Sequence, residues 1–200
     1  IKGQIRQVHQ ILSENPDSRQ AVIGIWDAAL DGDPNLDTRD RPCNLALHFM
    51  IRDGELLTNV FTRSNDLIWG WSGANQFVWS VLAELLANAL GVAPGLITYN
   101  VSSLHIYERH WSRAESLYEF PAVMRATSAP TYEYSIDDLE RDIELLWGLE
   151  GDLRRAAFRS IPGLVSPTLA YFARVLVDHW GHSSPERGHL AGLPAALADA

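Results

Sequence analysis

Residues 43–62, CNLALHFMIRDGELLTNVFT, predict a β-hairpin and decide the class of fold. Both halves are rich in apolar residues, and Asp53-Gly54 between them is a preferred pair for a two-residue hairpin turn. Short apolar runs at 21–26 and 96–101 are bounded by turn residues and predict two further strands. We therefore expect a sheet that contains this hairpin.

One helix is predicted to be central to the fold. Residues 73–90 carry two adjacent apolar stripes that form a broad apolar face, and Gly91 follows as a C-terminal stop. Pro94-Gly95 is expected to form the turn after this helix. Other helices are predicted at residues 1–12, just beyond Tyr107 around His110 and Trp111, and at residues 135–149 and 167–180.

The predicted fold is α+β: a mixed sheet with a central buried helix and a mainly helical C-terminal part. We expect residues 1–120 to form the core. Residues 121–200 are expected to be a helical extension of the same domain or a small appended unit, entered through a connector at 121–134. Because Ile1 opens inside a predicted helix without a methionine, we expect the sequence to lack an N-terminal portion.

Composition limits the classes of partner. The net charge of −9 over 200 residues argues against binding DNA or RNA through bulk electrostatic attraction. An apolar run of about 18 residues, the length that spans a membrane, does not occur in the sequence. The single cysteine, Cys43, can form no internal disulfide and by itself makes no metal site. A reducing, cytoplasmic setting suits such a chain.

Cys43 has three possible explanations: a small buried hydrophobic residue, a reactive thiolate, or chance. It follows a loop rich in Asp and Arg and enters the apolar run of the predicted hairpin. Arg39 and Arg41 place positive charge next to it in the sequence, and positive charge stabilises a thiolate. We take Cys43 as the candidate nucleophile.

Polar clusters follow three other elements: Asp17-Ser18-Arg19, Arg63-Ser64-Asn65-Asp66 and His105-Ile106-Tyr107. Arg63 and Ser64 combine a cation with a hydroxyl, which suits a phosphate group. His105 and Tyr107 offer hydrogen bonds to sugar hydroxyls. Taken one at a time, these residues have structural explanations as a surface ion pair, a core histidine and a packed ring. Together they indicate a small phosphorylated substrate.

The sequence resembles the thymidylate synthase superfamily in four blocks that stand in the family's order. They are Asn15-Pro16-Asp17-Ser18-Arg19, Pro42-Cys43, Arg63-Ser64-Asn65-Asp66 and Leu104-His105-Ile106-Tyr107, within about residues 4–117. Within the family, the chain looks closer to the cytidylate hydroxymethylase branch in three segments, Met50-Ile51-Arg52-Asp53, Arg63-Ser64-Asn65-Asp66 and Asn100–Tyr107. Asn44 stands where synthases usually carry a histidine. The resemblance implies a thymidylate-synthase-like mixed sheet, with residues 1–120 as an incomplete catalytic core.

The resemblance also implies an activity. A homodimer would use 5,10-methylenetetrahydrofolate to hydroxymethylate a pyrimidine nucleoside monophosphate, CMP or dCMP, after addition of Cys43 to C6 of the base. The implied binding residues are Arg63, Ser64 and the other subunit's copy of Arg19 for phosphate, His105 and Tyr107 for sugar, and Asp66 for the pterin. The alternatives are a thymidylate synthase that methylates dUMP and an inactive nucleotide-binding homologue.

The position that reads the base has two candidates. Counting forward from Gly70 gives Ala74, whereas counting back from His105 gives Asn75 and requires one inserted residue near Ser72-Gly73. An asparagine amide pairs with O4 and N3–H of uracil, as in synthases, while the deoxycytidylate enzymes use an aspartate. Two other departures concern the rest of the site. Gln20 replaces a second family arginine, and the family's catalytic glutamate and aromatic folate-site residue lie upstream of the matched blocks.

Overall fold

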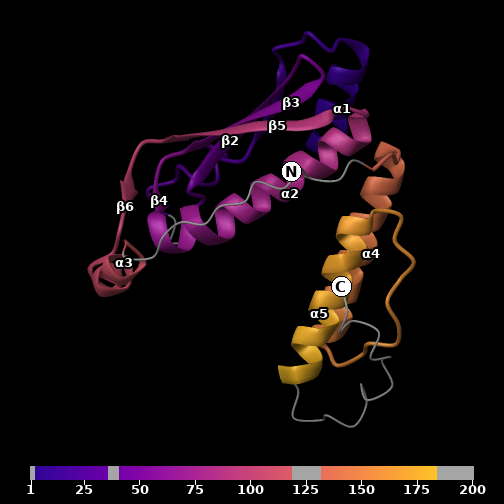
Figure 1. The fold of residues 1–200 in the computed structure, drawn as a ribbon. Helices are drawn as coiled ribbons and strands as arrows, with labels where there is room; N and C mark the ends of the chain where they lie inside the picture. The colour runs from indigo at the N-terminus through magenta and orange to yellow at the C-terminus, as the bar shows by residue number, and fades with distance from the viewer. Residues whose placement is uncertain (1–2, 36–40, 119–131, 184–200) are drawn as a thin grey trace. The chain divides into compact units, whose positions relative to one another are not determined.

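The computed structural model describes residues 3–35, 41–118 and 132–183, and the chain divides into two compact units, Ile1–Ile136 and Asp137–Ala200 (Figure 1). Each unit has its own hydrophobic core. The predicted boundary near residue 120 falls outside the described residues, as do most of the connector and the tail after residue 183. Within the described ranges, no helix has the length and apolar character needed to cross a membrane.

The first unit is built on a mixed four-stranded sheet in the order β1-β2-β3-β5 (Figure 1). The strands are β1 Ala21–Gly24, β2 Asn44–Arg52, β3 Glu55–Thr62 and β5 Ala93–Val101. The first three pair antiparallel, and β5 pairs parallel with β3. A second, two-stranded parallel sheet joins β4 Asn65–Asp66 to β6 Leu104–His105. The α+β prediction is therefore confirmed.

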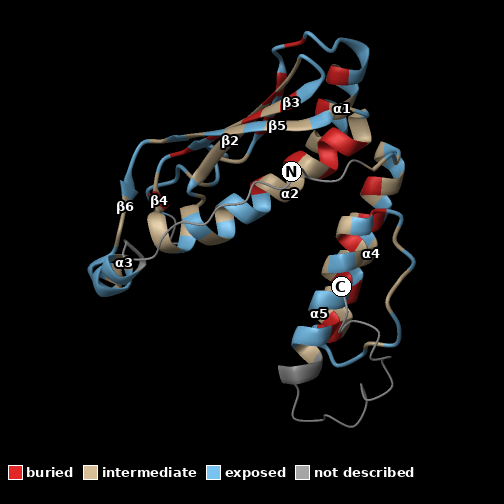
Figure 2. Cartoon of the chain, in the orientation of Figure 1, coloured by how far each residue is buried: buried red, intermediate tan, exposed pale blue. Residues whose placement is uncertain are grey.

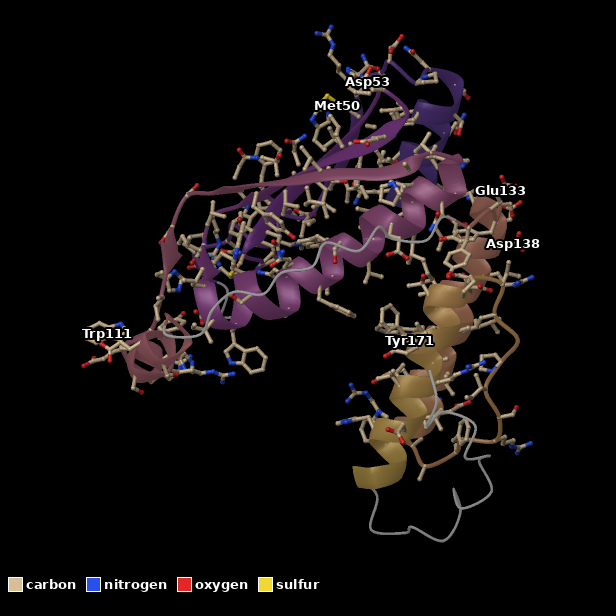
Figure 3. The ribbon with its side chains drawn as sticks, in the orientation of Figure 1. Met50, Asp53, Trp111, Glu133, Asp138 and Tyr171 are labelled. Atoms are coloured by element: carbon tan, nitrogen blue, oxygen red, sulfur yellow. The ribbon has the colours of Figure 1, made fainter. Side chains whose placement is uncertain are left out.

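The predicted hairpin turn is present at the end of β2 and β3. Asp53 and Gly54 both have positive φ, 52° and 79°, as the two central residues of a type I′ turn require. Arg52 then pairs with Glu55, and this register continues to Leu47 opposite Val60. Asp53 lies at the tip of the hairpin in Figure 3.

Two helices cover one face of this sheet: α1 Gln4–Glu14 and α2 Asn75–Leu90. Their buried positions gather with those of the strands in one core, drawn red in Figure 2. The core includes Val8, Leu12, Leu47, Phe49, Leu56, Val60 and Leu86, which are fully buried. Every second residue of β3 is buried, because successive side chains of a strand point to opposite faces, and Leu56 and Val60 among them belong to this core.

The predicted central helix is buried mainly in its C-terminal half. Leu85, Leu86 and Ala87 are buried, whereas Phe77 and Val78 near its start are about half exposed. The helix ends where predicted, at Gly91, whose φ of 68° suits a residue without a Cβ. Its first turn therefore faces away from the main core.

The predicted turn at Pro94-Gly95 is wrong, because both residues lie in β5. This strand forms an edge of the sheet, where a missing proline N–H is tolerated. The pairing skips a residue between Leu56 opposite Pro94 and Thr58 opposite Ile97. A Cβ at Gly95 would lie 3.0 Å from the Leu56 carbonyl oxygen, a tight contact that a glycine avoids. Gly91 alone therefore turns the chain from α2 into the sheet.

The second unit contains two helices, α4 Ile136–Arg154 and α5 Pro167–Ser183, at the predicted positions but longer. Leu149 and Leu153 of α4 pack with Ala173 and Val177 of α5. Asp142 is fully buried, and its carboxylate accepts the backbone N–H groups of Val165 and Ser166 at 2.7 Å each. This carboxylate holds the residues that precede the first turn of α5.

We predict that Asp142→Ala lowers the free energy of unfolding by about 2–4 kcal/mol, because two backbone donors lose their acceptor. Denaturation with urea, followed by circular dichroism, measures the change. The matched control is Asp152→Ala, which removes a half-exposed partner of Arg155 on the same helix and should cost less than about 1 kcal/mol. Equal losses in the two variants would show that the Asp142 bonds do not support the unit.

Candidate active site

A cavity of about 240 Å³ lies where the two sheets of the first unit meet. Its lining residues are Cys43, Ser64, Asn65, Asp66, Trp69, Gly70, Asn75, His105, Tyr107 and Arg109. Another hollow, of about 320 Å³, lies over Leu45, Phe61 and Asn100, and none of its six lining residues is ionisable. Only the first combines a thiol, a carboxylate, an imidazole and amides, so we take it as the candidate site.

Cys43 is the residue immediately before β2, and it lines this cavity. Its side chain is exposed, so the explanation as a small buried hydrophobic residue does not hold. The backbone carbonyl of Cys43 accepts the N–H of Arg63 at 2.9 Å, which ties the start of β2 to the end of β3. The hairpin thereby fixes the backbone that carries the thiol.

The Arg63 side chain points to the segment before Cys43 and does not line the cavity. Its Nε donates to the Pro42 carbonyl at 3.0 Å and its Nη2 to the Arg41 carbonyl at 3.1 Å. These bonds use two of the five guanidinium donors. Arg63 therefore holds the chain that leads into Cys43, a role that the sequence did not suggest.

Two of the three other cations expected near Cys43 or the phosphate, Arg41 and Arg19, are also absent from the lining of the cavity. Arg41 donates to the carbonyls of Asp31 and Asp33, at 2.8 and 2.7 Å. Arg19 is exposed and follows the turn after α1, away from the cavity-lining residues. Arg39 lies outside the described residues.

The pairing of β4 with β6 brings two of the predicted clusters together. Asp66 lies opposite His105 in this register, and Ser64 precedes β4 at the cavity. One carboxylate oxygen of Asp66 accepts the N–H of Ile68 at 2.9 Å. The other, Oδ2, is buried and has no partner among the described residues. An acceptor in this state suits a ligand N–H group, since a buried unpaired acceptor is costly.

His105 and Tyr107 form an aromatic edge of the cavity, with ring centroids 4.9 Å apart. The Arg109 guanidinium lies over the Tyr107 ring at 4.4 Å from its centroid. Sequence reasoning missed Arg109, although a cation two residues after Tyr107 could have signalled it. Trp111, labelled in Figure 3, begins α3 Trp111–Tyr118 and donates to the Ile106 carbonyl at 3.4 Å.

Asn75 lines the cavity, whereas Ala74 is exposed and does not. The segment Leu67–Ala74 that precedes α2 is π-helical with a kink at Gly73, and the Asn75 N–H donates to the Gly70 carbonyl five residues earlier. A π-helical turn takes up one residue more than an α-helical turn. This geometry accommodates the one inserted residue that the count back from His105 requires.

The π-helical segment is anchored on the sheet by an aromatic pair. The ring of Trp71 meets that of Tyr99 on β5 edge to face, with centroids 4.6 Å apart. Burial raises the pKa of Tyr99, because desolvation disfavours the phenolate. On the other side of Cys43, Trp79 of α2 donates from its indole nitrogen to Asn44 Oδ1 at 3.2 Å. Sequence reasoning missed this link between α2 and the residue after the nucleophile.

The cavity suits organic ligands with N–H donors better than a metal. Asp66 Oδ2 accepts no hydrogen bond from the part of the chain that the structure describes, and Trp69 is two-thirds exposed at the same cavity. Among the described side chains, no group of three or more His, Cys, Asp and Glu residues is arranged to hold a metal ion.

Comparison with known proteins gives a consistent family. The deoxyuridylate hydroxymethyltransferase of Bacillus phage SP01 is 45% identical over 104 residues, which are 52% of this chain and 27% of that protein. That of Pseudomonas phage M6 is 38% identical over 132 residues, 65% of this chain and 37% of the phage protein. A putative thymidylate synthase of Methanosarcina acetivorans is 35% identical over 114 residues, 57% and 50% of the two chains.

The solved structure of thermostable thymidylate synthase A from Bacillus subtilis has the same fold. It superposes with a TM-score of 0.52 at 25% identity over 59% of this chain and 41% of that one. The chain thus spans from about a quarter to a half of the length of the relatives that it matches. The Thymidylate synthase family matches residues 2–142, which contain every residue of the cavity. The chain belongs to the thymidylate synthase family.

Proposed function

We propose that the cavity binds a pyrimidine nucleoside monophosphate and that Cys43 is the nucleophile of a folate-dependent one-carbon transfer to C5 of the base. The observation that carries this proposal is the convergence of the exposed Cys43 thiol with Asn75 in one cavity. Cys43 directly precedes strand β2, whereas Asn75 begins helix α2. A thiol and an amide in one cavity are the two groups needed to attack a pyrimidine and to hold its polar edge.

In the proposed reaction, the Cys43 sulfur forms a bond to C6 and the C5=C6 electron pair moves to C5. C5 would then bond to the one-carbon carbon, and loss of the C5 proton would break the bond between that carbon and the folate nitrogen, so that tetrahydrofolate departs and an exocyclic methylene remains. Water would add to this methylene to give a hydroxymethyl group. Departure of the Cys43 thiolate restores the C5=C6 double bond. A synthase differs in the last stage, because hydride in place of water gives a methyl group.

The cofactor in this proposal is 5,10-methylenetetrahydrofolate, which supplies the one-carbon unit when it is bound. Asp66 Oδ2 suits its pterin, because this buried oxygen lacks a partner in the described part of the chain and the pterin edge carries N–H donors. Trp69 offers an exposed aromatic surface at the same cavity.

The nucleotide's sugar and phosphate are assigned to the polar groups at the cavity edge. His105 and Tyr107 would bind the sugar and Ser64 the phosphate, since all three line the cavity. Arg63 lies outside this lining, and in the proposal its guanidinium donors other than those bonded to the Pro42 and Arg41 carbonyls would reach the phosphate from beside Ser64. Arg19 would reach the phosphate from the second subunit of a homodimer, because it lies away from the cavity of its own chain. We place this enzyme in the cytoplasm, where a lone thiol stays reduced.

Two classes of substrate are candidates, deoxyuridylate and the cytidylates CMP and dCMP. Deoxyuridylate is favoured by the position of Asn75 in the cavity and by the names of the two phage relatives. CMP or dCMP, the expectation from sequence, is favoured by the hydroxymethylase-like segments Met50–Asp53 and Asn100–Tyr107. We propose hydroxymethylation of deoxyuridylate first, with cytidylate hydroxymethylation and deoxyuridylate methylation as the alternatives.

Cys43→Ser is expected to lower turnover below roughly 1% of wild type, because loss of a covalent nucleophile costs orders of magnitude. Nucleotide binding, measured by calorimetry on the same variant, should change by less than about three-fold, since the change in side-chain volume is small. A variant that keeps substantial turnover would remove Cys43 from the mechanism.

Incubation with labelled dUMP, dCMP or CMP and methylenetetrahydrofolate identifies the reaction. Hydroxymethyl product leaves tetrahydrofolate, whereas methyl product leaves dihydrofolate. Catalytic efficiency should differ at least ten-fold between uracil and cytosine nucleotides, because a buried polar edge without its partner costs about 1–3 kcal/mol. Methylated dUMP would make the protein a synthase, and a protein that binds nucleotide without any product would be an inactive homologue.

Mixing Arg19→Ala and Cys43→Ser subunits tests the proposed shared site. Each single variant should be inactive, but a hybrid dimer contains one site with both residues intact. Random pairing should restore about a quarter of wild-type activity, since half of the dimers are hybrid and each has one working site. Inactive hybrids, shown to be mixed by mass spectrometry, would mean that each chain builds its own site.

A further inference from the structure

Asn65 is a buried residue whose side chain is hydrogen-bonded to the side-chain amide of Asn75 at the cavity. Its side chain is 2% exposed, and its Oδ1 accepts a hydrogen bond from Asn75 Nδ2 at 3.0 Å. Both residues line the cavity, Asn65 from β4 and Asn75 from the start of α2. The two amides are ten residues apart in sequence, and the π-helical segment between them brings them together.

Gly70 makes this contact possible. A Cβ built at Gly70 would overlap Asn65 Oδ1 and would lie 3.2 Å from Asn75 Nδ2. Any larger residue would therefore displace the Asn65 amide from its partner. The backbone of the π-helical segment leaves room for this hydrogen bond.

The direction of the Asn75 amide decides which base it can pair with. Uracil presents a donor at N3 and an acceptor at O4, whereas cytosine presents an acceptor at N3 and a donor at its amino group. A primary amide can match either pattern, but only after its oxygen and nitrogen exchange places. A neighbour that accepts from the nitrogen holds the amide in one of the two directions.

We infer that Asn65 is a positioning residue for base specificity, because its Oδ1 fixes the direction of the Asn75 amide. The inference rests on the proposed function, in which the cavity binds a pyrimidine nucleotide. It assigns to Asn65 no contact with the reacting atoms. Its effect is on the ratio of affinities for uracil and cytosine nucleotides and not on affinity in general.

Calorimetric titration of the chain with dUMP and with dCMP tests the inference through the ratio of the two dissociation constants. Wild type should discriminate at least ten-fold, as expected when one base leaves a polar edge unpaired. Asn65→Leu removes the acceptor and should reduce the ratio to within about three-fold of unity. Asn65→Asp at about pH 8 keeps an acceptor-only group at the same place and should retain the wild-type ratio.

Two further variants complete the design. Gln76→Leu removes an exposed amide next to Asn75 and should leave the ratio unchanged. If Asn65→Leu does not fold by circular dichroism, Gly70→Ala replaces it, because its Cβ pushes the Asn65 amide aside. The same loss of discrimination is expected.

The outcomes separate this inference from the proposed function. Loss of discrimination in Asn65→Leu with retention in Asn65→Asp supports the positioning role. Discrimination that survives Asn65→Leu overturns it, and so does equal loss in both variants, which would indicate pocket shape. A wild type that binds both nucleotides equally also overturns it but leaves the proposed function intact. A wild type that binds neither nucleotide removes the proposed function, and the inference with it.

Discussion

The antiparallel pairing of β2 with β3 across the Asp53-Gly54 turn is the constraint on which the site depends. The register set by the turn holds as far as Ala46 opposite Phe61, and a shift of one residue between Ala46 and Asn44 then places Asn44 opposite Thr62. The next residues outward, Cys43 and Arg63, meet through a backbone hydrogen bond of 2.9 Å. A slip of one residue would exchange the two faces of the hairpin and expose Leu47 and Phe49. Burial of that face against α1 and α2 therefore fixes the backbone of Cys43 as well. The pairing of β2 with β3 therefore determines both which side chains enter the core and where the backbone of Cys43 lies.

The opposite side of the cavity depends on an irregular segment. The chain leaves β3, forms the short β4, and passes through a π-helical segment before α2 begins. If the chain were regular α-helix from Leu67 onward, the Asn75 side chain would be turned around the helix axis by about one residue step, roughly 100°. Asp66 caps the segment, and Trp71 holds it on Tyr99. The cavity therefore joins a regular hairpin with a segment whose irregularity has identifiable contacts, and irregular backbone of this kind is frequent at functional sites.

The hairpin, α2 and its stop at Gly91 could be predicted from the sequence, because each has a local signal that tertiary contacts do not override. The strand conformation of Pro94-Gly95 could not be predicted, because a Pro-Gly pair occurs both in turns and in edge strands. Only the order of the strands in the sheet distinguishes the two cases. The grouping of Cys43 with Ser64, Asp66 and His105 was expected from the family blocks. The bonds of Arg63 to the carbonyls of Arg41 and Pro42, and the pairing of Asn65 with Asn75, depend on backbone positions distant in sequence.

Protection of Cys43 from alkylation tests the central claim most directly, because Cys43 is the single thiol of the chain. The rate of modification by iodoacetamide is measured by mass spectrometry with and without dUMP. If the nucleotide occupies the cavity, dUMP at ten times its dissociation constant should slow modification roughly ten-fold. dAMP carries the same phosphate and sugar and should have little effect at that concentration. An unchanged rate at saturating dUMP, or equal protection by dAMP, would contradict a pyrimidine site at Cys43.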